Sequence, residues 1–315
     1  MTGFPASSRV LIVAGKGGVG KTTLGATIGF SAARAGVDTL LIELEGHSSL
    51  GHPFGIDALP YQEQDLLVDV ERHLGPVPGR LRGRRLTPDD ALLEYLAAHG
   101  LDRVGSKLLA TGAVEVVSTA APGIRDVLAL GKIRQLETAS DAELIVVDAP
   151  AAGHAISFLR SPAGLADSTT AGPVREQADA VLEMLADDRR CQVMLVTLPE
   201  ETPVTELVET AFDLEDEVGV KLAPVVVNGV WPTIEGLAEA LDALPRPRTR
   251  LAEARKEAAV FRLARCEAQS EQIRRLTNEL ALPTVTLPQL FTPTIDIDAM
   301  KNLGGQYVSQ MSALV

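Results

Sequence analysis

The feature that most constrains this chain is the glycine-rich run GKGGVGKTT at residues 15–23. An apolar run, residues 10–14, precedes it, and a helix-like run, residues 24–35, follows. Strand, glycine-rich loop and helix in this order are the context in which the pattern G-x-x-x-x-G-K-[ST] predicts a phosphate-binding loop. Backbone N–H groups of the loop can converge on phosphate oxygens, and the positive end of the helix points at the same place. The predicted nucleotide-binding residues of the loop are Gly15, Gly17, Gly18, Val19, Gly20, Lys21, Thr22 and Thr23.

Three side chains of this loop have separate expected roles. Lys21 should reach the β- and γ-phosphates, and the Thr22 hydroxyl should bind Mg²⁺. Lys16 is a second lysine near the start of the loop. A second lysine is useful if it reaches a phosphate across a dimer interface, as an arginine finger does. The alternative for Lys16 is a solvated loop lysine.

Composition limits the possible partners and compartments. The chain has 315 residues, and a chain of this length is expected to form about two domains, although α/β folds of this size often form a single one. A net charge of −13 argues against non-specific binding to nucleic acid or anionic membranes. No stretch of about 18 apolar residues is present, and the first residues have no signal pattern. Cys191 and Cys266 form no C-x-x-C pair, which favours buried thiols in a reducing cytoplasm.

Apolar runs alternate with helical patterns along most of the chain. Several runs are nearly continuous and β-branched, as strands buried on both faces are. This alternation predicts an α/β fold with a doubly wound, mostly parallel sheet flanked by helices. The expected strands are residues 9–14, 38–44, 143–147, 192–198, 223–227 and 284–287. The expected helices are residues 24–35, 173–186, 203–218 and 249–280, with a packed terminal helix within 294–315.

Residues 60–140 break the alternation and are mostly helical in pattern, most clearly at 88–98 and 123–139. We interpret them as a helical subdomain inserted into a nucleotide-binding domain formed by residues 1–59 and 141–315. Residues 76–85, PVPGRLRGRR, are interpreted as a mobile surface loop, with a basic binding loop as the alternative. Five leucines of this region could line a groove for an apolar segment or form the subdomain core; they are Leu92, Leu93, Leu96, Leu108 and Leu109.

An acid follows the four apolar residues 144–147 and is the expected carboxylate on the Mg²⁺ side. That acid is Asp148. In P-loop folds the groups that sense the γ-phosphate and Mg²⁺ lie at the carboxyl ends of neighbouring strands. A carboxylate held there can accept a hydrogen bond from Thr22 or from a metal-bound water. The sequence therefore predicts Thr22 and Asp148 as the metal-side pair, the latter acting through water.

The chain resembles the arsenite-pump and tail-anchored-protein targeting ATPases, a branch of the deviant P-loop ATPases. The loop itself resembles their K-G-G-x-G-K-[ST]-T pattern. The run DAPAAGH at residues 148–154 resembles their switch II, and Phe158, Leu159 and Pro162 match F-L-x-x-P. Residues 122–124 resemble a P-G-I helix start, residues 196–200 a V-T-x-P-E loop, and residues 226–228 a V-V-N strand end. These matches run in family order over about residues 9–300.

The resemblance implies a dimeric Mg-dependent ATPase that binds ATP and ADP. It implies nucleotide contacts at Pro199, Glu200 and Asn228, the last to adenine, and catalytic roles for Lys16, Lys21 and Asp148. It also implies a switch at Gly153 and His154. Because the chain has one P-loop, a composite site needs a second chain, either a copy of itself or a paralogous ATPase. A client or membrane-protein partner is expected, and nucleic acid is not.

Switch I departs from the family pattern D-P-A-H. The family's water-orienting Asp falls on Glu45, and Gly46 and His47 replace the Pro and Ala. Glu could still orient a water, but its extra methylene displaces the carboxylate, and errors of about 1 Å can cost roughly 10²-fold in rate. Slow hydrolysis is therefore expected, with Glu45 the first candidate for water orientation and Glu43 an alternative. His47 and His154 could sense the γ-phosphate or be ordinary loop histidines.

Two further functions compete with an active ATPase. One is a low-turnover nucleotide-binding scaffold that forms half of a heterodimer. The other is a partition or cell-division ATPase, which the acidic charge and a tail with Lys301 as its one basic residue disfavour. The family's zinc C-x-x-C is absent, and Cys191 and Cys266 do not suit an iron–sulfur cluster, so no zinc or iron–sulfur site is expected.

Overall fold

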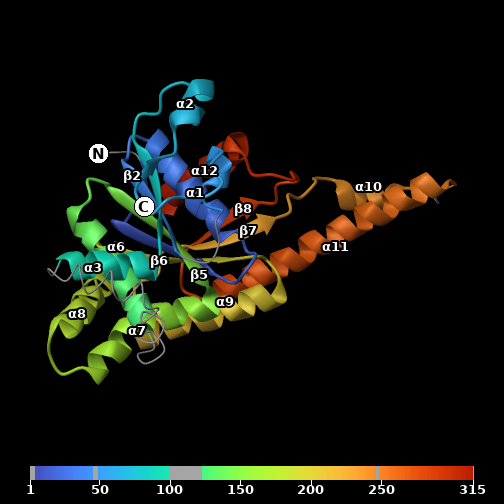
Figure 1. Cartoon of the computed structure of the whole chain (residues 1–315). Helices are drawn as coiled ribbons and strands as arrows, with labels where there is room; N and C mark the ends of the chain where they lie inside the picture. Colours follow the sequence, from blue (N-terminus) through green and yellow to red (C-terminus); the bar gives the residue numbers. More distant parts are fainter. Residues whose placement is uncertain (1–3, 45–48, 99–122, 246–247, 315) are drawn as a thin grey trace.

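A computed structural model describes residues 4–44, 49–98, 123–245 and 248–314 of the chain. Its centre is a mostly parallel β-sheet with helices on both faces (Figure 1). The strand order is β3-β4-β2-β5-β1-β6-β7-β8, and of the described strand pairs β3–β4 is antiparallel. The strands are β1 Val10–Gly15, β2 Thr39–Leu44, β3 Gln64–Asp65, β4 Leu81–Leu86, β5 Leu144–Ala151, β6 Cys191–Thr197, β7 Val225–Val230 and β8 Thr284–Pro288. The predicted doubly wound α/β fold is confirmed.

The helices that the apolar spacing predicts are present, with ends close to the expected ones. A single turn of 3-10 helix, His52–Phe54, and a π-helical turn, Leu214–Val218, accompany them. The helices are α1 Lys21–Arg34, α2 Val68–Leu74, α3 Pro88–Ala98, α6 Ile124–Ala139, α7 Ala152–Ser168, α8 Pro173–Ala186, α9 Glu201–Asp213, α10 Leu237–Ala243, α11 Arg250–Glu279 and α12 Ile297–Leu314. None in the described part of the chain is long and apolar enough to cross a membrane.

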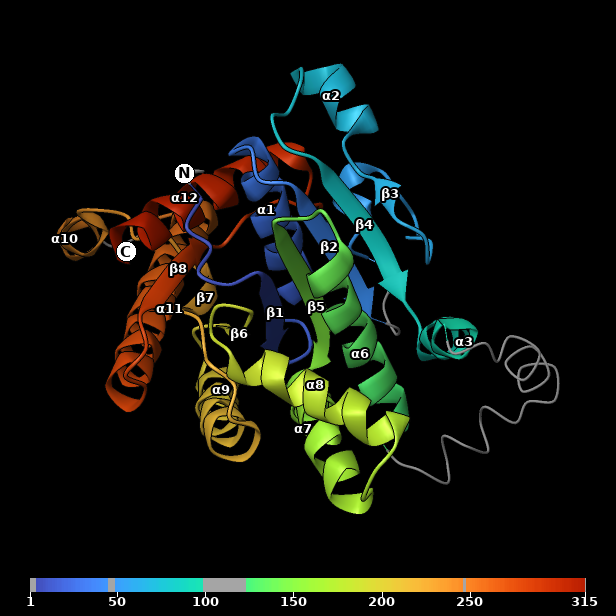
Figure 2. The same ribbon diagram turned by 90° about the vertical axis from the view of Figure 1, so that its left-hand side faces the viewer.

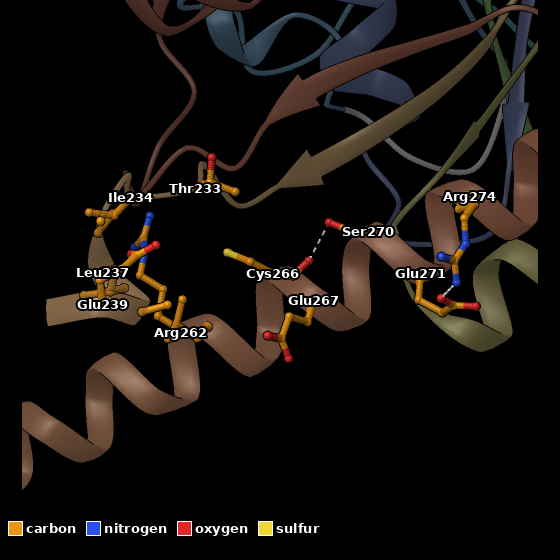
Figure 3. A pocket seen from close by; sticks show the side chains of 13 residues that line it. Thr233, Ile234, Leu237, Glu239, Arg262, Cys266, Glu267, Ser270, Glu271 and Arg274 are labelled. Carbon is orange, nitrogen blue, oxygen red and sulfur yellow. Dashed lines mark hydrogen bonds and ion pairs between the residues drawn. The ribbon is translucent and has the colours of Figure 1, made fainter. Parts of the chain in front are cut away.

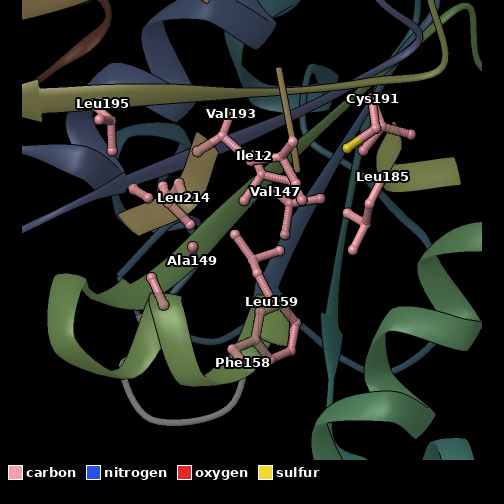
Figure 4. Close-up of a cluster of buried hydrophobic side chains, with 14 of the residues drawn as sticks. Ile12, Val147, Ala149, Phe158, Leu159, Leu185, Cys191, Val193, Leu195 and Leu214 are labelled. Carbon is pink, nitrogen blue, oxygen red and sulfur yellow. The ribbon is translucent and has the colours of Figure 1, made fainter. Parts of the chain in front are cut away.

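Successive residues of the central strands face opposite sides of the sheet and so enter two separate cores. Ile12 lies in the core under α6, α7, α8 and α9, whereas Val13 lies in the core under α1 and α12. Figure 4 shows the first core, where Ile12, Phe158 and Leu159 pack together. Figure 2 shows the two helical layers on either side of the strands. Covering both faces explains why β1 and the first half of β5 carry apolar side chains on both sides.

The interpretation of residues 76–85 as a surface loop is wrong for its second half. β4 begins at Leu81 and pairs in parallel with β2. Two of its arginines, Arg82 and Arg84, are compatible with a strand because other segments supply partners for their charged ends. The Arg84 guanidinium lies 4.6 Å from the Tyr61 ring centroid, and Arg82 lies 2.6 Å from a Glu63 carboxylate oxygen. The sheet therefore extends into residues 60–140, and the division of the chain at 60 and 140 stays a prediction.

Two long C-terminal helices differ in how they are covered. α12 packs on α1 and buries Met300 and Tyr307, so the predicted packed terminal helix is confirmed. α11 packs near its C-terminal end, where Leu276 is buried, and projects from the body of the molecule at its N-terminal end (Figure 1). There Leu251 and Phe261 are more than half exposed.

Candidate functional site

The loop between β1 and α1 has a backbone that only glycine accommodates at two positions. A Cβ on Gly15 would lie 2.3 Å from the Val196 carbonyl oxygen, and φ there is 156°. Gly20, the N-cap of α1, has a φ of 95°, and its Cβ would lie 2.3 Å from Asn228 Nδ2. The loop thus packs closely against the carboxyl ends of β6 and β7. Its N–H groups lie at the positive end of α1, where anions bind.

Lys21 is the first residue of α1, and its ammonium folds back over the loop. Lys21 Nζ donates a hydrogen bond of 3.1 Å to the Lys16 carbonyl oxygen. Burial lowers the pKa of Lys21, and the nearby carboxylate of Asp148 opposes that shift. A partly desolvated ammonium beside a ring of N–H donors gains when a phosphate anion replaces the lost water.

Thr22 and Asp148 come together as predicted, because β5 pairs with β1 and ends beside the start of α1. Thr22 Oγ1 donates a hydrogen bond of 2.6 Å to Asp148 Oδ2. Asp148 is 9% exposed and is aligned with Val13 of β1 and Glu43 of β2. A hydroxyl and a carboxylate are the hard oxygen donors that Mg²⁺ prefers. The donor set therefore fits that ion.

A cavity of about 610 Å³ opens in front of the loop. It lies between the P-loop, the end of β2, the end of β5 and the starts of α6 and α7. Its described lining residues are Gly17, Gly18, Gly20, Lys21, Thr22, Leu44, Ser49, Asp126, Asp148, Ala149, Pro150, His154, Ser157 and Phe158. The predicted phosphate-binding and metal-side residues thus meet at one space that suits a ligand of nucleotide size.

Lys16 points away from that cavity and toward α9. Lys16 Nζ lies 2.5 Å from Glu206 Oε1, and both side chains are more than a third exposed. The Lys16 side chain is therefore engaged by α9, and Lys16 is not among the described residues that line the cavity.

The residues expected to contact the base border the loop. Asn228 Nδ2 donates a hydrogen bond of 2.9 Å to the Val19 carbonyl oxygen. Glu200 is the residue before α9, and its carboxylate pairs with Arg265 of α11 at 2.5 Å. Pro199 precedes it in the bend after β6. Thr23 is half-buried in the first turn of α1. The structure brings Asn228 to the P-loop but places Glu200 in an ion pair with α11.

The switch I candidates Glu45, Gly46 and His47 lie outside the described residues, as do Leu108 and Leu109. Glu43, the alternative for water orientation, is 1% exposed and does not line the cavity. Its Oε1 accepts hydrogen bonds from the N–H groups of Ser49 and Leu50, at 2.7 and 3.0 Å. Glu43 therefore ties the residues after switch I to the end of β2.

In switch II, Gly153 and His154 are exposed residues of the first turn of α7. His154 lines the cavity and interacts electrostatically with Asp126 of α6. Burial raises the pKa of Asp126, and the charges of Arg125 and His154 oppose that shift.

Sequence reasoning missed two acids at this site. Asp126 was within reach, because it is the third residue of a helix whose P-G-I start was recognised. Glu206 carried no signal, because it lies inside an ordinary amphipathic helix and its role depends on where α9 packs.

A second cavity, of about 510 Å³, lies between α10 and α11 and shares no described lining residue with the first (Figure 3). Ile234 and Leu237 face Arg262 and Cys266 across it. Its walls mix apolar groups with charges of both signs, and nothing in its chemistry selects a ligand.

The site combines a strand, a glycine-rich phosphate-binding loop and a helix. Asp148 of the neighbouring strand accepts a hydrogen bond from Thr22, the residue after Lys21. These features define a P-loop nucleoside triphosphatase. Comparison with known families narrows the class. A family model described as anion-transporting ATPase matches residues 8–171. The chain therefore belongs to the anion-transporting ATPase family and is an ATPase.

Individual relatives agree with this membership. The ATPase BagA of Mycobacterium tuberculosis is 30% identical over 313 residues, which cover 97% of this chain and 84% of BagA. The arsenical pump-driving ATPase of Escherichia coli is 27% identical over 74% of this chain and 41% of its own length. That of Acidiphilium multivorum is 28% identical, also over 74% of this chain and 41% of its own length. The chain thus matches under half the length of these pump-driving ATPases.

Proposed function

We propose that this ATPase uses Mg²⁺ and works as a dimer whose nucleotide state controls a helical surface for a client or partner. The observation that carries the proposal is the hydrogen bond between Thr22 and Asp148 at the wall of the P-loop cavity. Two neighbouring oxygen donors beside the P-loop support a metal site there, because P-loop ATPases hold the metal beside the phosphates. Bound Mg²⁺ would supply charge neutralisation of the β- and γ-phosphate oxygens.

The residues of the chain would divide the work as follows. N–H groups of Gly17 to Lys21 and the Lys21 ammonium bind the phosphates and offset their charge. The Thr22 hydroxyl and the Asp148 carboxylate would hold Mg²⁺, the latter through a water. Asn228, which donates a hydrogen bond to the loop, contacts the adenine base of the nucleotide. Lys16 supplies its ammonium to the phosphates of the partner subunit.

The test of hydrolysis is phosphate release by the full chain, with and without Mg²⁺, against a Lys21→Ala variant. Loss of release in Lys21→Ala supports the proposal. Equal release from both chains would overturn it.

The test of the composite site mixes Lys16→Ala and Lys21→Ala chains after subunit exchange. Each variant alone should be inactive, but a mixed dimer has one site with both lysines. An equimolar mixture should therefore regain about a quarter of the wild-type rate, because half of the dimers are mixed and each holds one competent site. A mixture no faster than the two variants alone contradicts action across the interface.

A second candidate is a low-turnover half of a heterodimer with a paralogous ATPase. The ion pair of Lys16 with Glu206 favours it, because the lysine needed by a partner is engaged within its own chain. This candidate predicts Lys21-dependent ATP binding with little phosphate release until the paralogue is added.

A further inference from the structure

Asp126 is an acid that the P-loop motifs do not include but that faces the nucleotide cavity. It lies in the first turn of α6, and the next residue, Val127, is buried. One and two turns further on, Leu130 and Ile133 are fully buried in the core beneath the sheet. α6 also packs against α7 and α8. The carboxylate therefore comes from a rigid element, as groups that position reactants generally do.

The cavity presents two carboxylates among its described lining residues, and they differ in what they contact. Asp148 accepts the hydrogen bond of Thr22 and lies on the metal side. Asp126 is half-buried on the α6 wall, and no hydrogen bond joins it to another side chain of the described chain. The charges around it are those of Arg125 and His154.

A carboxylate in a cavity for a triphosphate weakens ground-state binding, because like charges repel. Such a group is useful where a proton acceptor is needed. Hydrolysis needs one: the water that attacks the γ-phosphorus must be oriented, and a carboxylate that accepts its hydrogen bond does this.

We propose that Asp126 positions the attacking water in ATP hydrolysis, from the α6 wall of the cavity that the P-loop also lines. The inference rests on the proposed function. The water oxygen forms a bond to the γ-phosphorus while the bond from that phosphorus to the β,γ-bridging oxygen breaks. The electron pair stays with the β-phosphate of ADP. One water proton moves to the Asp126 carboxylate and is then lost to solvent, and the products are ADP and phosphate.

The position of Asp126 also links the proposed reaction site to neighbouring elements of the fold. Its helix continues to Ala139, just before β5, and its electrostatic neighbour His154 begins the switch II helix. A water held by Asp126 is therefore contacted from the element that joins residues 60–140 to the central strand.

The test compares the full-length wild type with Asp126→Asn, Asp126→Glu and the control Asp188→Asn, which removes an exposed carboxylate outside the cavity. Two quantities are measured for each: the saturated rate of phosphate release with Mg-ATP, and the Kd of a fluorescent ATP analogue. Asp126→Asn should lower kcat by about 100-fold, as loss of a positioning group does. Its Kd should stay within twofold of wild type or become tighter, because a repulsive charge is removed.

Asp126→Glu should recover part of kcat, and Asp188→Asn should match the wild type in both quantities. A kcat for Asp126→Asn within twofold of wild type overturns the inference, and so does a parallel loss of nucleotide affinity. Wild-type release that depends on Lys21 but survives Asp126→Asn overturns this inference alone. If the wild type shows no Lys21-dependent release, the proposed function fails and the inference fails with it.

Discussion

Lys16 Nζ lies 2.5 Å from Glu206 Oε1, so one helix of the chain holds the lysine that its partner would need. Glu206 lies on α9, directly after the β6 turn that contains Pro199 and Glu200. In the proposed composite site, a phosphate of a second subunit would therefore compete with Glu206 for the Lys16 ammonium.

Glu206→Gln should release Lys16 and make nucleotide-dependent association easier. A partly exposed ion pair contributes about 0.2–1 kcal/mol, which corresponds to a gain of about 1.4-fold to fivefold in association. The measurement is the dependence of phosphate release on protein concentration, with sedimentation of the ATP-bound chain alongside. Glu209→Gln, an exposed acid on the same helix, is the matched control. An unchanged concentration dependence in Glu206→Gln would show that the pair does not restrain Lys16.

Gly20→Ala should destabilise the free protein before any nucleotide is added. The new Cβ would meet Asn228 Nδ2 at 2.3 Å, and the left-handed backbone adds a cost of about 1–2 kcal/mol. Unfolding in urea should show a loss of about 1–3 kcal/mol. Gly17→Ala is the control, because a Cβ there has no described atom within 4 Å, and its stability should change by less than about 0.5 kcal/mol. Equal stability of the two variants would argue against the close packing of Asn228 on the loop.

Thr22→Ala should separate metal-dependent from metal-independent nucleotide binding. The variant loses a hydroxyl that contacts Asp148 and would contact Mg²⁺. Titration with a fluorescent ATP analogue should show that Mg²⁺ strengthens binding to wild type but not to Thr22→Ala, while binding in EDTA is alike. Thr22→Ser keeps the hydroxyl and should restore the Mg²⁺ effect. A full Mg²⁺ effect in Thr22→Ala would remove Thr22 from the metal site.

Thiol labelling should distinguish the two cysteines. Burial raises the pKa of Cys191 to about 12, so the thiol stays protonated and unreactive at pH 8, whereas Cys266 is partly exposed. An aromatic disulfide reagent should label one thiol per native chain and two in guanidinium. Because the native state keeps the Cys191 proton to higher pH than the unfolded chain does, this group also lowers stability as pH rises above about 9. Loss of native labelling in Cys266→Ser is the check on assignment.

Much of the fold follows from local pattern. The β-branched runs of β5 and β7 identify buried parallel strands, and GKGGVGKTT places a helix and a phosphate cradle after β1. Asp148, which lies within β5, is predictable as well, because a carboxylate that follows an apolar run of a central strand in such a fold lies beside the P-loop. Sheet pairing then brings Asp148 to Thr22 without further information.

β4 and the Lys16–Glu206 pair were not predictable in this way. Arg82, Arg84 and Arg85 look like a solvated loop, and they fit a strand because Tyr61, Glu63 and Asp141 meet two of them from other segments. Residues far apart in sequence supply these partners, so no local window contains the signal. Glu206 likewise becomes significant only once α9 packs beside the first loop.

Helix α11 is packed at its C-terminal end and projects from the body of the molecule at its N-terminal end. Its C-terminal end is fixed under the sheet by Leu276, and Arg265 near its middle is held by Glu200, at the turn that follows β6. At the rise of an α-helix, Leu276 lies about 39 Å from Arg250 and about 16.5 Å from Arg265, so a tilt about Leu276 would move Arg250 about 2.4 times as far as Arg265. A displacement of Glu200 that moves Arg265 by about 1 Å would thus move the exposed Leu251 by about 2 Å.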